Sequence, residues 1–139
     1  MKILIDTNVI LDVLVKRKPY AGESVSFLKL CGHQITGCIA TSQTTDIFYL
    51  LRRYGKDSDE AKDVIKKLSK NIKVLDVTAA DVDNALASLM PDYEDALLAC
   101  LAKRQKAKYI VTRNEKDFRQ SPVQAVSPSL FLSNNNFLV

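Results

Sequence analysis

The sequence predicts an α/β protein: a three-layer α/β/α sandwich around a central, mainly parallel sheet, formed by a single domain over residues 1–139. Three observations favour this class. Short apolar runs alternate with longer segments of helical periodicity, which is typical of parallel strands joined by crossover helices. A chain of 139 residues that is 47% hydrophobic suits one compact domain with one core. Glycine and proline number only four each, too few for a many-turned β-sandwich or barrel.

The expected strands are short apolar or β-branched runs bounded by turn or cap signals. They are residues 2–5, 34–40, 72–77, 109–112 and, as a short edge strand, 122–126. The run at 2–5 is apolar throughout, as in a strand that is buried on both faces.

The expected helices have apolar residues at helical spacing between recognisable start and stop signals. In chain order they are 9–15, 20–31 before Gly32, 41–54 before Gly55, 58–68, 78–89 between a Thr78 cap and Pro91, 92–105, and 129–132 after Ser127-Pro128. The helix at 92–105 is apolar on nearly every side from Ala96 to Ala102, so we expect it to be central and buried. The asparagines at 134–136 are expected to fray.

The chain carries 20 lysines and arginines against 16 aspartates and glutamates, a formal charge of +4. Cations near helix C-termini are favourable by themselves, which gives a purely structural reading of the basic clusters. Beside an acidic cleft, the same clusters suit a phosphate backbone, and composition leaves both readings open. The clusters are residues 16–18, 52–53, 103–108, and Arg113 with Lys116 and Arg119.

Cysteine and histidine usage excludes several kinds of site. Cys31, Cys38 and Cys100 form no CxxC pair, and His33 is the single histidine. Structural zinc and a Cys-His or Ser-His catalytic pair therefore lack their usual ligands and bases. We expect a reduced, cytoplasmic chain that is not associated with a membrane, because no segment approaches ~18 uninterrupted apolar residues.

Several aspartates follow strands or open helices at one edge of the expected sheet. Asp6 ends the first strand, Asp46 lies early in the helix after the second, Asp92 and Asp95 open the helix before the fourth, and Asp117 follows the fourth. Crossover helices run antiparallel to their strands, so helix N-termini and strand carboxyl ends share the edge where such sheets bind ligands. We therefore expect these acids to meet.

Acids in a first helical turn also occur for capping and dipole reasons alone, and this reading stays open for Asp92 and Glu94. Asp95 is harder to explain in that way, because it shares a stripe with Leu98, Ala99 and Ala102. The acids at 57, 59, 60 and 63 lie on a polar helix that also carries lysines at 62, 66, 67 and 70, and they are expected to be solvated surface.

Carboxylates gathered at one edge repel one another, and a divalent cation removes that penalty. Oxygen ligands without thiolate or imidazole select Mg²⁺ or Mn²⁺. Such an ion can polarise a phosphodiester and activate water without a histidine base, and either one or two ions would be compatible with this number of acids.

Four segments in this order, residues 3–12 (ILIDTNVILD), 44–53 (TTDIFYLLRR), 92–97 (DYEDAL) and 111–118 (VTRNEKDF), resemble those of the PIN domain family. This family consists of metal-dependent nucleases and includes the VapC-like toxins of toxin–antitoxin pairs. The resemblance implies a metal-dependent endoribonuclease that cuts RNA. It also implies a homodimer and a small antitoxin partner.

The resemblance also implies roles for individual residues. The catalytic acids would be Asp6, Asp46, Asp95 and Asp117. The metal ligands would be Asp6, Asp95 and Asp117, with Asp46, Asp92 and Asn114 as further candidates. The substrate-binding residues would be Thr7, Asn8, Thr112, Arg113 and Lys116, with Lys16, Arg17 and Lys18 as further candidates. Asp46 stands where the family more often has glutamate, and Asn114 stands where it usually has the fourth acid.

Two other interpretations fit part of this sequence. Asn114 favours, as the alternative, a non-catalytic PIN-like module that binds RNA or protein through an incomplete metal site. A phosphoryl-transfer protein of the haloacid-dehalogenase or receiver kind also has an aspartate after its first strand. The former would need a second aspartate where this chain has Asn8, and the latter would need surroundings that Asp76 lacks.

Overall fold

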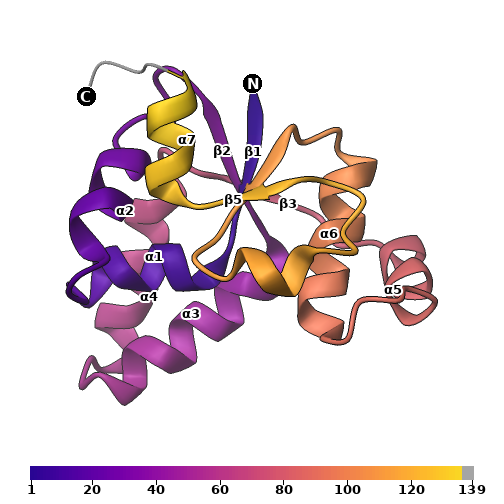
Figure 1. The fold of residues 1–139 in the computed structure, drawn as a ribbon. Helices are drawn as coiled ribbons and strands as arrows, with labels where there is room; N and C mark the ends of the chain where they lie inside the picture. The colour runs from indigo at the N-terminus through magenta and orange to yellow at the C-terminus, as the bar shows by residue number, and fades with distance from the viewer. Residues whose placement is uncertain (136–139) are drawn as a thin grey trace.

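The computed structural model describes residues 1–135, in which five strands form one central sheet (Figure 1). Every neighbouring pair of strands is parallel, and their order across the sheet is β3-β2-β1-β4-β5. The strands are β1 Lys2–Ile5, β2 Thr36–Ala40, β3 Lys73–Leu75, β4 Tyr109–Val111 and β5 Ala125–Val126. The expected parallel sheet is thus confirmed.

Helices cover both faces of this sheet. Figure 1 shows α1, α2, α3, α4 and α7 on one side and α5 with α6 on the other. Their bounds are α1 Thr7–Leu14, α2 Ala21–Leu28, α3 Thr41–Arg53, α4 Ser58–Leu68, α5 Ala79–Leu86, α6 Tyr93–Arg104 and α7 Pro128–Asn135, with a 3-10 helix, η1, at Glu115–Phe118. The three-layer α/β/α architecture expected from the sequence is therefore confirmed.

The alternation of side chains along each strand divides the core into two clusters. Ile3 and Ile5 of β1 pack towards α1, α2, α3 and α7, whereas Leu4 between them packs towards α5 and α6. All three side chains are fully buried. Helix α6 contributes six buried residues, as its apolar sequence predicted.

Several element boundaries differ from the sequence-based expectation, among them β5, which is shorter than 122–126, and α7, which is longer than 129–132. β3 is shorter than 72–77, and η1 was not expected. Helix α5 ends at Leu86 instead of 89, which leaves Leu86 and Leu89 largely exposed. At this end the Ser88 hydroxyl accepts a hydrogen bond from the Met90 backbone N–H at 3.1 Å, a local bond that competes with helix continuation.

The C-terminal helix and the surface of α4 also bear on earlier expectations. Asn134 and Asn135 are helical, so the expected fraying is not seen there, and Asn136 lies outside the described residues.

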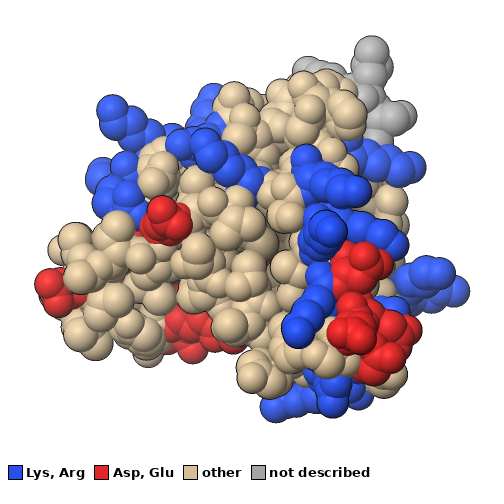
Figure 2. Space-filling view, turned by 180° about the vertical axis from the view of Figure 1, so that it is seen from behind, with Lys and Arg blue, Asp and Glu red and all other residues tan. Residues whose placement is uncertain are grey.

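Figure 2 shows acidic and basic side chains interleaved on the side where α4 lies, and Asp63 and Lys67 form an exposed ion pair at 2.9 Å. This surface is solvated, as expected. Within residues 1–135, no helix combines the length and the apolar character needed to cross a membrane.

The chain order of the strands fixes where a ligand can bind. From β1 the chain builds outward through β2 to β3, and it then crosses to the other side of β1 to form β4 and β5. The direction therefore reverses between β1 and β4. In open α/β sheets, the crevice outside the carboxyl ends of two such strands is the usual ligand site. Asp6 directly follows β1, and Thr112 directly follows β4.

Candidate active site at the carboxyl edge of the sheet

Asp6 and Thr112 are joined where β1 and β4 end. The Thr112 hydroxyl donates to Oδ2 of Asp6 at 2.7 Å, and its oxygen accepts the backbone N–H of Asn114 at 3.0 Å. Thr112 is fully buried, and the Asp6 backbone N–H donates to the Val111 carbonyl at 2.9 Å. Asp6 is the N-cap residue of α1, but its side chain makes no capping bond. The Asp6 carboxylate is therefore fixed by Thr112 and does not form the usual side-chain cap of α1.

Burial is the main influence on the acidity of Asp6. It raises the pKa of this carboxyl, although the hydrogen bonds from Thr112 and the Thr7 backbone and the charge of Arg113 act in the opposite direction. The negative charge of Asp117 on η1 adds to the increase. Asp6 and Asp117, separated by most of the chain, thus act on each other electrostatically.

The first turn of α6 brings three acids to the same edge. Asp92 is the N-cap residue, and its Oδ1 accepts the Asp95 backbone N–H at 2.9 Å, so the capping interpretation holds for it. Asp95 has a pKa raised to about 7, first by burial and then by the charges of Asp6, Asp92, Asp117 and Glu94. The acids that the sequence placed at one edge therefore lie within electrostatic reach of one another.

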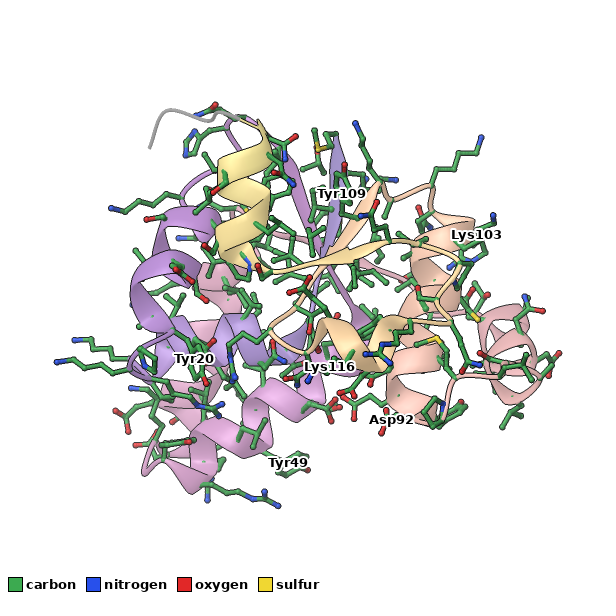
Figure 3. The ribbon with its side chains drawn as sticks, in the orientation of Figure 1. Tyr20, Tyr49, Asp92, Lys103, Tyr109 and Lys116 are labelled. Atoms are coloured by element: carbon green, nitrogen blue, oxygen red, sulfur yellow. The ribbon has the colours of Figure 1, made fainter. Side chains whose placement is uncertain are left out.

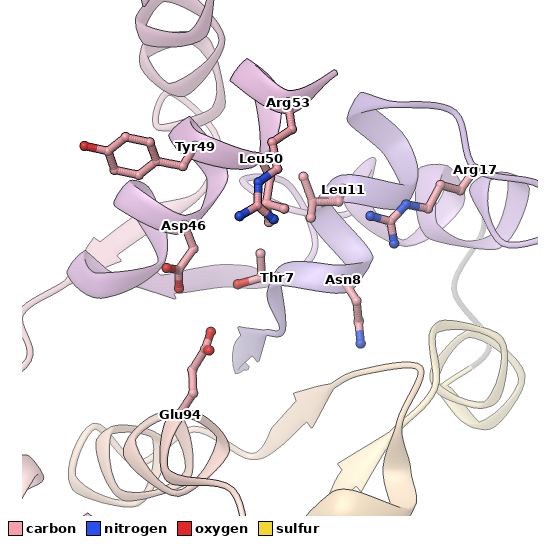
Figure 4. A pocket seen from close by; sticks show the side chains of 9 residues that line it. All are labelled: Thr7, Asn8, Leu11, Arg17, Asp46, Tyr49, Leu50, Arg53 and Glu94. Carbon is pink, nitrogen blue, oxygen red and sulfur yellow. The ribbon is translucent and has the colours of Figure 1, made fainter. Parts of the chain in front are cut away.

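Glu94 faces Asp46 across a pocket of about 390 Å³ (Figure 4). The pKa of Glu94 is raised to about 7 by burial and by a hydrogen bond with Asp46, and the charges of Asp92 and Asp6 raise it further. Such a bond between two carboxyl groups requires a proton on one of them. The pocket is lined by Thr7, Asn8, Leu11, Arg17, Asp46, Tyr49, Leu50, Arg53 and Glu94.

A buried glutamine connects the elements beneath this pocket. Gln43 Nε2 donates to the Ile5 carbonyl at 2.7 Å and to Thr7 Oγ1 at 3.1 Å, and its Oε1 accepts the Ala40 backbone N–H at 2.7 Å. Gln43 is 1% exposed. One side chain thus fixes the end of β1 against the start of α3, and through Thr7 it fixes the pocket wall.

Arg113 is held by protein groups instead of pointing freely into the site. Its Nε donates to Oδ2 of the buried Asp12 at 2.6 Å, and its guanidinium lies 4.0 Å from the centre of the Tyr20 ring. The Arg113 backbone N–H is 3.5 Å from Oδ1 of Asn8. Its expected contact with substrate remains a prediction, and its contacts in the fold are structural.

The other residues expected to bind substrate lie in different places. Thr7, Asn8 and Arg17 line the pocket, whereas Lys16 and Lys18 are exposed and do not line it. Lys116 lies on the exposed side of η1, at the same edge as Asp92, and Lys103 lies at the opposite edge (Figure 3). The predicted substrate-binding cations outside Arg113 are thus Arg17 in the pocket, the exposed Lys16 and Lys18, and Lys116 on η1, and their contact with substrate stays a prediction.

The structure places several polar or aromatic residues at or beside the site that the sequence did not assign to it, namely Asp12, Gln43, Tyr49, Arg53 and Glu94. Two of them had a detectable signal. Asp46, Tyr49, Leu50 and Arg53 recur at i, i+3, i+4 and i+7, the spacing of one helix face. By contrast, the bonds of Gln43 and Asp12 are tertiary, and local pattern does not predict them.

The donor set at this edge fits a hard divalent cation in its chemistry. Every candidate ligand is an oxygen, and the acids raise one another's pKa, which is the repulsion that a cation relieves. In residues 1–135, no three histidine, cysteine or acidic side chains are grouped so as to hold one ion. Mg²⁺ commonly uses only one or two carboxylates and keeps several waters, so these acids fit such a site.

Comparison with solved structures supports the fold. The VapBC2 complex from Rickettsia felis, bound to a promoter DNA fragment, matches with a TM-score of 0.71 at 17% identity, covering 91% of this chain and 98% of that one. A toxin–antitoxin complex from Klebsiella pneumoniae matches with 0.69 at 20% identity, covering 90% and 96%. VapC20 from Mycobacterium tuberculosis, a sarcin-ricin loop cleaving toxin, matches with 0.64 at 15% identity, covering 78% and 86%.

Sequence comparison gives the family. No curated protein matches the chain in sequence. The sequence profile of the PIN domain, however, matches residues 2–116, which include Asp6, Asp46, Asp95 and Thr112. The match covers most of the chain and the acids of this edge from Asp6 to Asp95, and it ends one residue before Asp117. The chain therefore belongs to the PIN domain family.

Proposed function

We propose that this protein is a Mg²⁺- or Mn²⁺-dependent endoribonuclease that hydrolyses phosphodiester bonds in RNA. The observation that carries the proposal is the set of mutually repelling carboxylates at the β1–β4 switch point, where Glu94 and Asp95 have pKa values of about 7. Acids held in this way fit a divalent cation, and a cation is the reagent that a nuclease site with no histidine near it requires.

In this proposal Asp6, Asp46, Asp95 and Asp117 are the catalytic acids. Asp6, Asp95 and Asp117 are the main candidate metal ligands, of which one or two would contact a given ion directly, and Asp46, Asp92 and Asn114 are further candidates. A bound cation would supply Lewis-acid polarisation of the phosphate and lower the pKa of attacking water. The chain itself orients the acids: Thr112 fixes Oδ2 of Asp6, and Gln43 fixes Thr7 beside it. Thr7, Asn8, Thr112, Arg113, Lys116 and the 16–18 cluster are the proposed substrate contacts.

The test is cleavage of a mixed RNA pool by the full chain in Mn²⁺, followed on a denaturing gel. We expect Asp6→Asn and Asp95→Asn each to reduce the rate by at least ~100-fold, because each removes charge that the metal needs. Asp83→Asn is the matched control, since Asp83 is an exposed acid on α5, away from the site. Equal cleavage by all four proteins would refute the assignment.

A second function is favoured by one observation, the amide at position 114. There the backbone N–H of Asn114 donates to Oγ1 of Thr112, and the amide side chain adds no negative charge to the site. The alternative is a non-catalytic module that binds RNA or protein through an incomplete metal site. Calorimetry with Mn²⁺ separates the two: metal binding accompanied by RNA turnover excludes the module, and RNA binding without turnover at any Mn²⁺ concentration supports it.

We propose further that the protein is the toxin of a type II toxin–antitoxin pair, acting in the cytoplasm as a homodimer of one domain over residues 1–139. Support comes from the fold shared with toxin–antitoxin complexes and with a sarcin-ricin loop cleaving toxin. All three cysteines are unpaired, which is consistent with a reducing compartment. Co-expression with the product of a small neighbouring gene should relieve growth inhibition, and light scattering should give the dimer mass. Growth unaffected by the wild type would contradict the toxin role.

A further inference from the structure

One face of α3 forms a wall of the pocket beside the acids. Asp46, Tyr49, Leu50 and Arg53 all line this pocket and share the face because they recur at i, i+3, i+4 and i+7. Asp46 lies at the acidic end, opposite Glu94, and Figure 4 shows Arg53 extending into the pocket towards Thr7. A single helix face therefore presents an acid, an aromatic ring and a cation in sequence along one hollow.

Within residues 1–135, the guanidinium of Arg53 is not engaged in stabilising the fold. Among residues 1–135, no ion pair or hydrogen bond engages it, whereas Arg104 and Arg113 are both bonded to buried aspartates. Arg17, which reaches the pocket from the other side, is held only weakly, at 3.9 Å from Asp12. A guanidinium that is free of acids and points into a hollow is suited to a phosphate, with which it can form two parallel hydrogen bonds.

Tyr49 carries an exposed aromatic ring on the same pocket-lining face of α3 as Arg53. Its exposed fraction is 64%, and it lines both this pocket and a second hollow formed with Thr44, Thr45, Phe48, Lys62 and Ile65. Phe48 supports the ring in an edge-to-face contact at 5.1 Å between centroids. The ring is thus oriented by the core side of α3 and open to solvent between two hollows, as in a stacking platform for a base.

We propose that Tyr49 and Arg53 form a nucleotide subsite for an unpaired stretch of RNA beside the bond that is cut. In this subsite an unpaired base stacks on Tyr49, and a neighbouring phosphate binds Arg53, with Arg17 on the far side. The assignment rests on the proposed ribonuclease function and adds the specificity-determining residues. It also makes the substrate single-stranded at this point.

An unpaired strand fits the subsite better than a duplex or a protein segment. The stacking face of a base is available only when the base leaves its helix, and double-stranded RNA presents its backbone and shallow groove instead. A protein segment that matched the pocket would need cations for Asp46 and Glu94 and acids for both arginines. RNA meets the arginines with phosphates, and the acids are the groups that the proposed metal neutralises.

The test uses the full chain with Asp95→Asn, which prevents substrate loss, and fluorescence anisotropy with a short labelled single-stranded RNA in Mg²⁺. Arg53→Gln is compared with Arg52→Gln, which removes the same charge from the adjacent, exposed position off the pocket face. Tyr49→Leu is compared with Tyr49→Phe, which keeps the ring. The same RNA annealed to its complement provides the duplex measurement.

We expect Arg53→Gln to reduce the salt dependence of binding by about 0.7 in log–log slope, and Arg52→Gln to leave the slope unchanged. Tyr49→Leu should weaken single-strand binding by roughly 5- to 100-fold, Tyr49→Phe should restore it, and duplex binding should not respond. Equal effects of Arg52→Gln and Arg53→Gln on the salt slope would overturn the subsite, and so would an equal loss of single-strand affinity in both Tyr49 variants. An unaltered RNA affinity in all variants would likewise overturn the subsite and leave a protein segment as the occupant to test.

The same measurements separate this inference from the function on which it rests. Cleavage of RNA by the protein with Asp95 intact, together with identical binding by the two arginine variants, removes the subsite and keeps the nuclease. Selective loss of binding in Arg53→Gln, without cleavage of any RNA by the intact protein, keeps the subsite and removes the nuclease.

Discussion

The carboxylate of Asp12 is fully buried, and Arg113 is the group that compensates its charge. Nε of Arg113 lies 2.6 Å from Oδ2, whereas Oδ1 has no hydrogen bond and the nearest other cation, Arg17, is 3.9 Å away. Removing one partner of a buried ion pair leaves an uncompensated charge, which usually costs more than the pair contributes. Arg113 is therefore first of all a structural residue, which stabilises the fold by neutralising Asp12.

We predict that Arg113→Gln lowers the free energy of unfolding by about 3 kcal/mol. Urea unfolding of the variant is compared with Arg119→Gln, an exposed arginine after η1, which should match the wild type. Addition of Asp12→Asn should recover part of the loss, because the charge to be compensated is then absent. If Arg113→Gln proved as stable as Arg119→Gln yet bound RNA more weakly, Arg113 would be a phosphate contact instead.

At the scale of elements, one bidentate contact joins α5 to α6. Nε and Nη2 of Arg104 lie 2.9 Å from Oδ1 and Oδ2 of Asp81, and Nη2 also donates to the Asp76 carbonyl at 2.7 Å. Asp81 simultaneously accepts the Thr78 backbone N–H at 2.9 Å in the first turn of α5. These bonds explain why the pKa of Asp81 is lowered, with the Arg104 hydrogen bond as the largest cause.

We predict that Asp81→Ala reduces the free energy of unfolding by about 1–3 kcal/mol, since it removes charge-assisted bonds at a buried position. Asp63→Ala is the control: it breaks an exposed ion pair on α4 and should leave stability unchanged. Because the folded pKa of Asp81 lies below its unfolded value near 3.8, its contribution is present above that pH and is lost on further acidification. The difference between wild type and Asp81→Ala should therefore vanish in strong acid, and a difference that persisted there would contradict this account.

The sequence was sufficient for the elements whose signals are local. Apolar runs and helix periodicity placed the strands and helices to within a few residues, and the all-round apolar segment of α6 identified the buried helix. Prediction from the sequence failed where a tertiary or side-chain contact decides where an element ends. The periodicity that extended α5 to Leu89 counted exposed leucines as core residues, and periodicity does not detect the local bond between the Ser88 hydroxyl and the Met90 backbone N–H beyond the helix end.

At the scale of the molecule, topology made part of the site predictable. Parallel strands bring Asp6, the first turn of α6 and the segment after β4 to one edge whatever the side-chain details, so the meeting of the acids followed from chain order. Which acids face which did not follow. Glu94 faces Asp46 and Asp92 serves as a cap, a division that depends on the rotation of α6 against the sheet.

This gathering of acids should make the stability of the metal-free protein fall as pH rises. Glu94 and Asp95 have folded pKa values of about 7, against ordinary values of 4.5 and 3.8. Between about pH 4 and 7 the native state binds more protons than the unfolded state, so the free energy of unfolding declines with pH over this window and stays low above it. In EDTA we therefore expect a lower Tm at pH 8 than at pH 5.5.

Asp95→Asn should flatten the dependence of Tm on pH in EDTA, because the residue at 95 no longer ionises. Asp83→Asn should leave that dependence unaltered. Added Mg²⁺ or Mn²⁺ should raise the Tm of the wild type at pH 8 more than at pH 5.5, since the cation binds the ionised acids that repel one another at the higher pH. A Tm in EDTA that rose from pH 5.5 to 8 would show that the acids are not coupled. A metal effect of equal size in Asp95→Asn would place the ion elsewhere on the molecule.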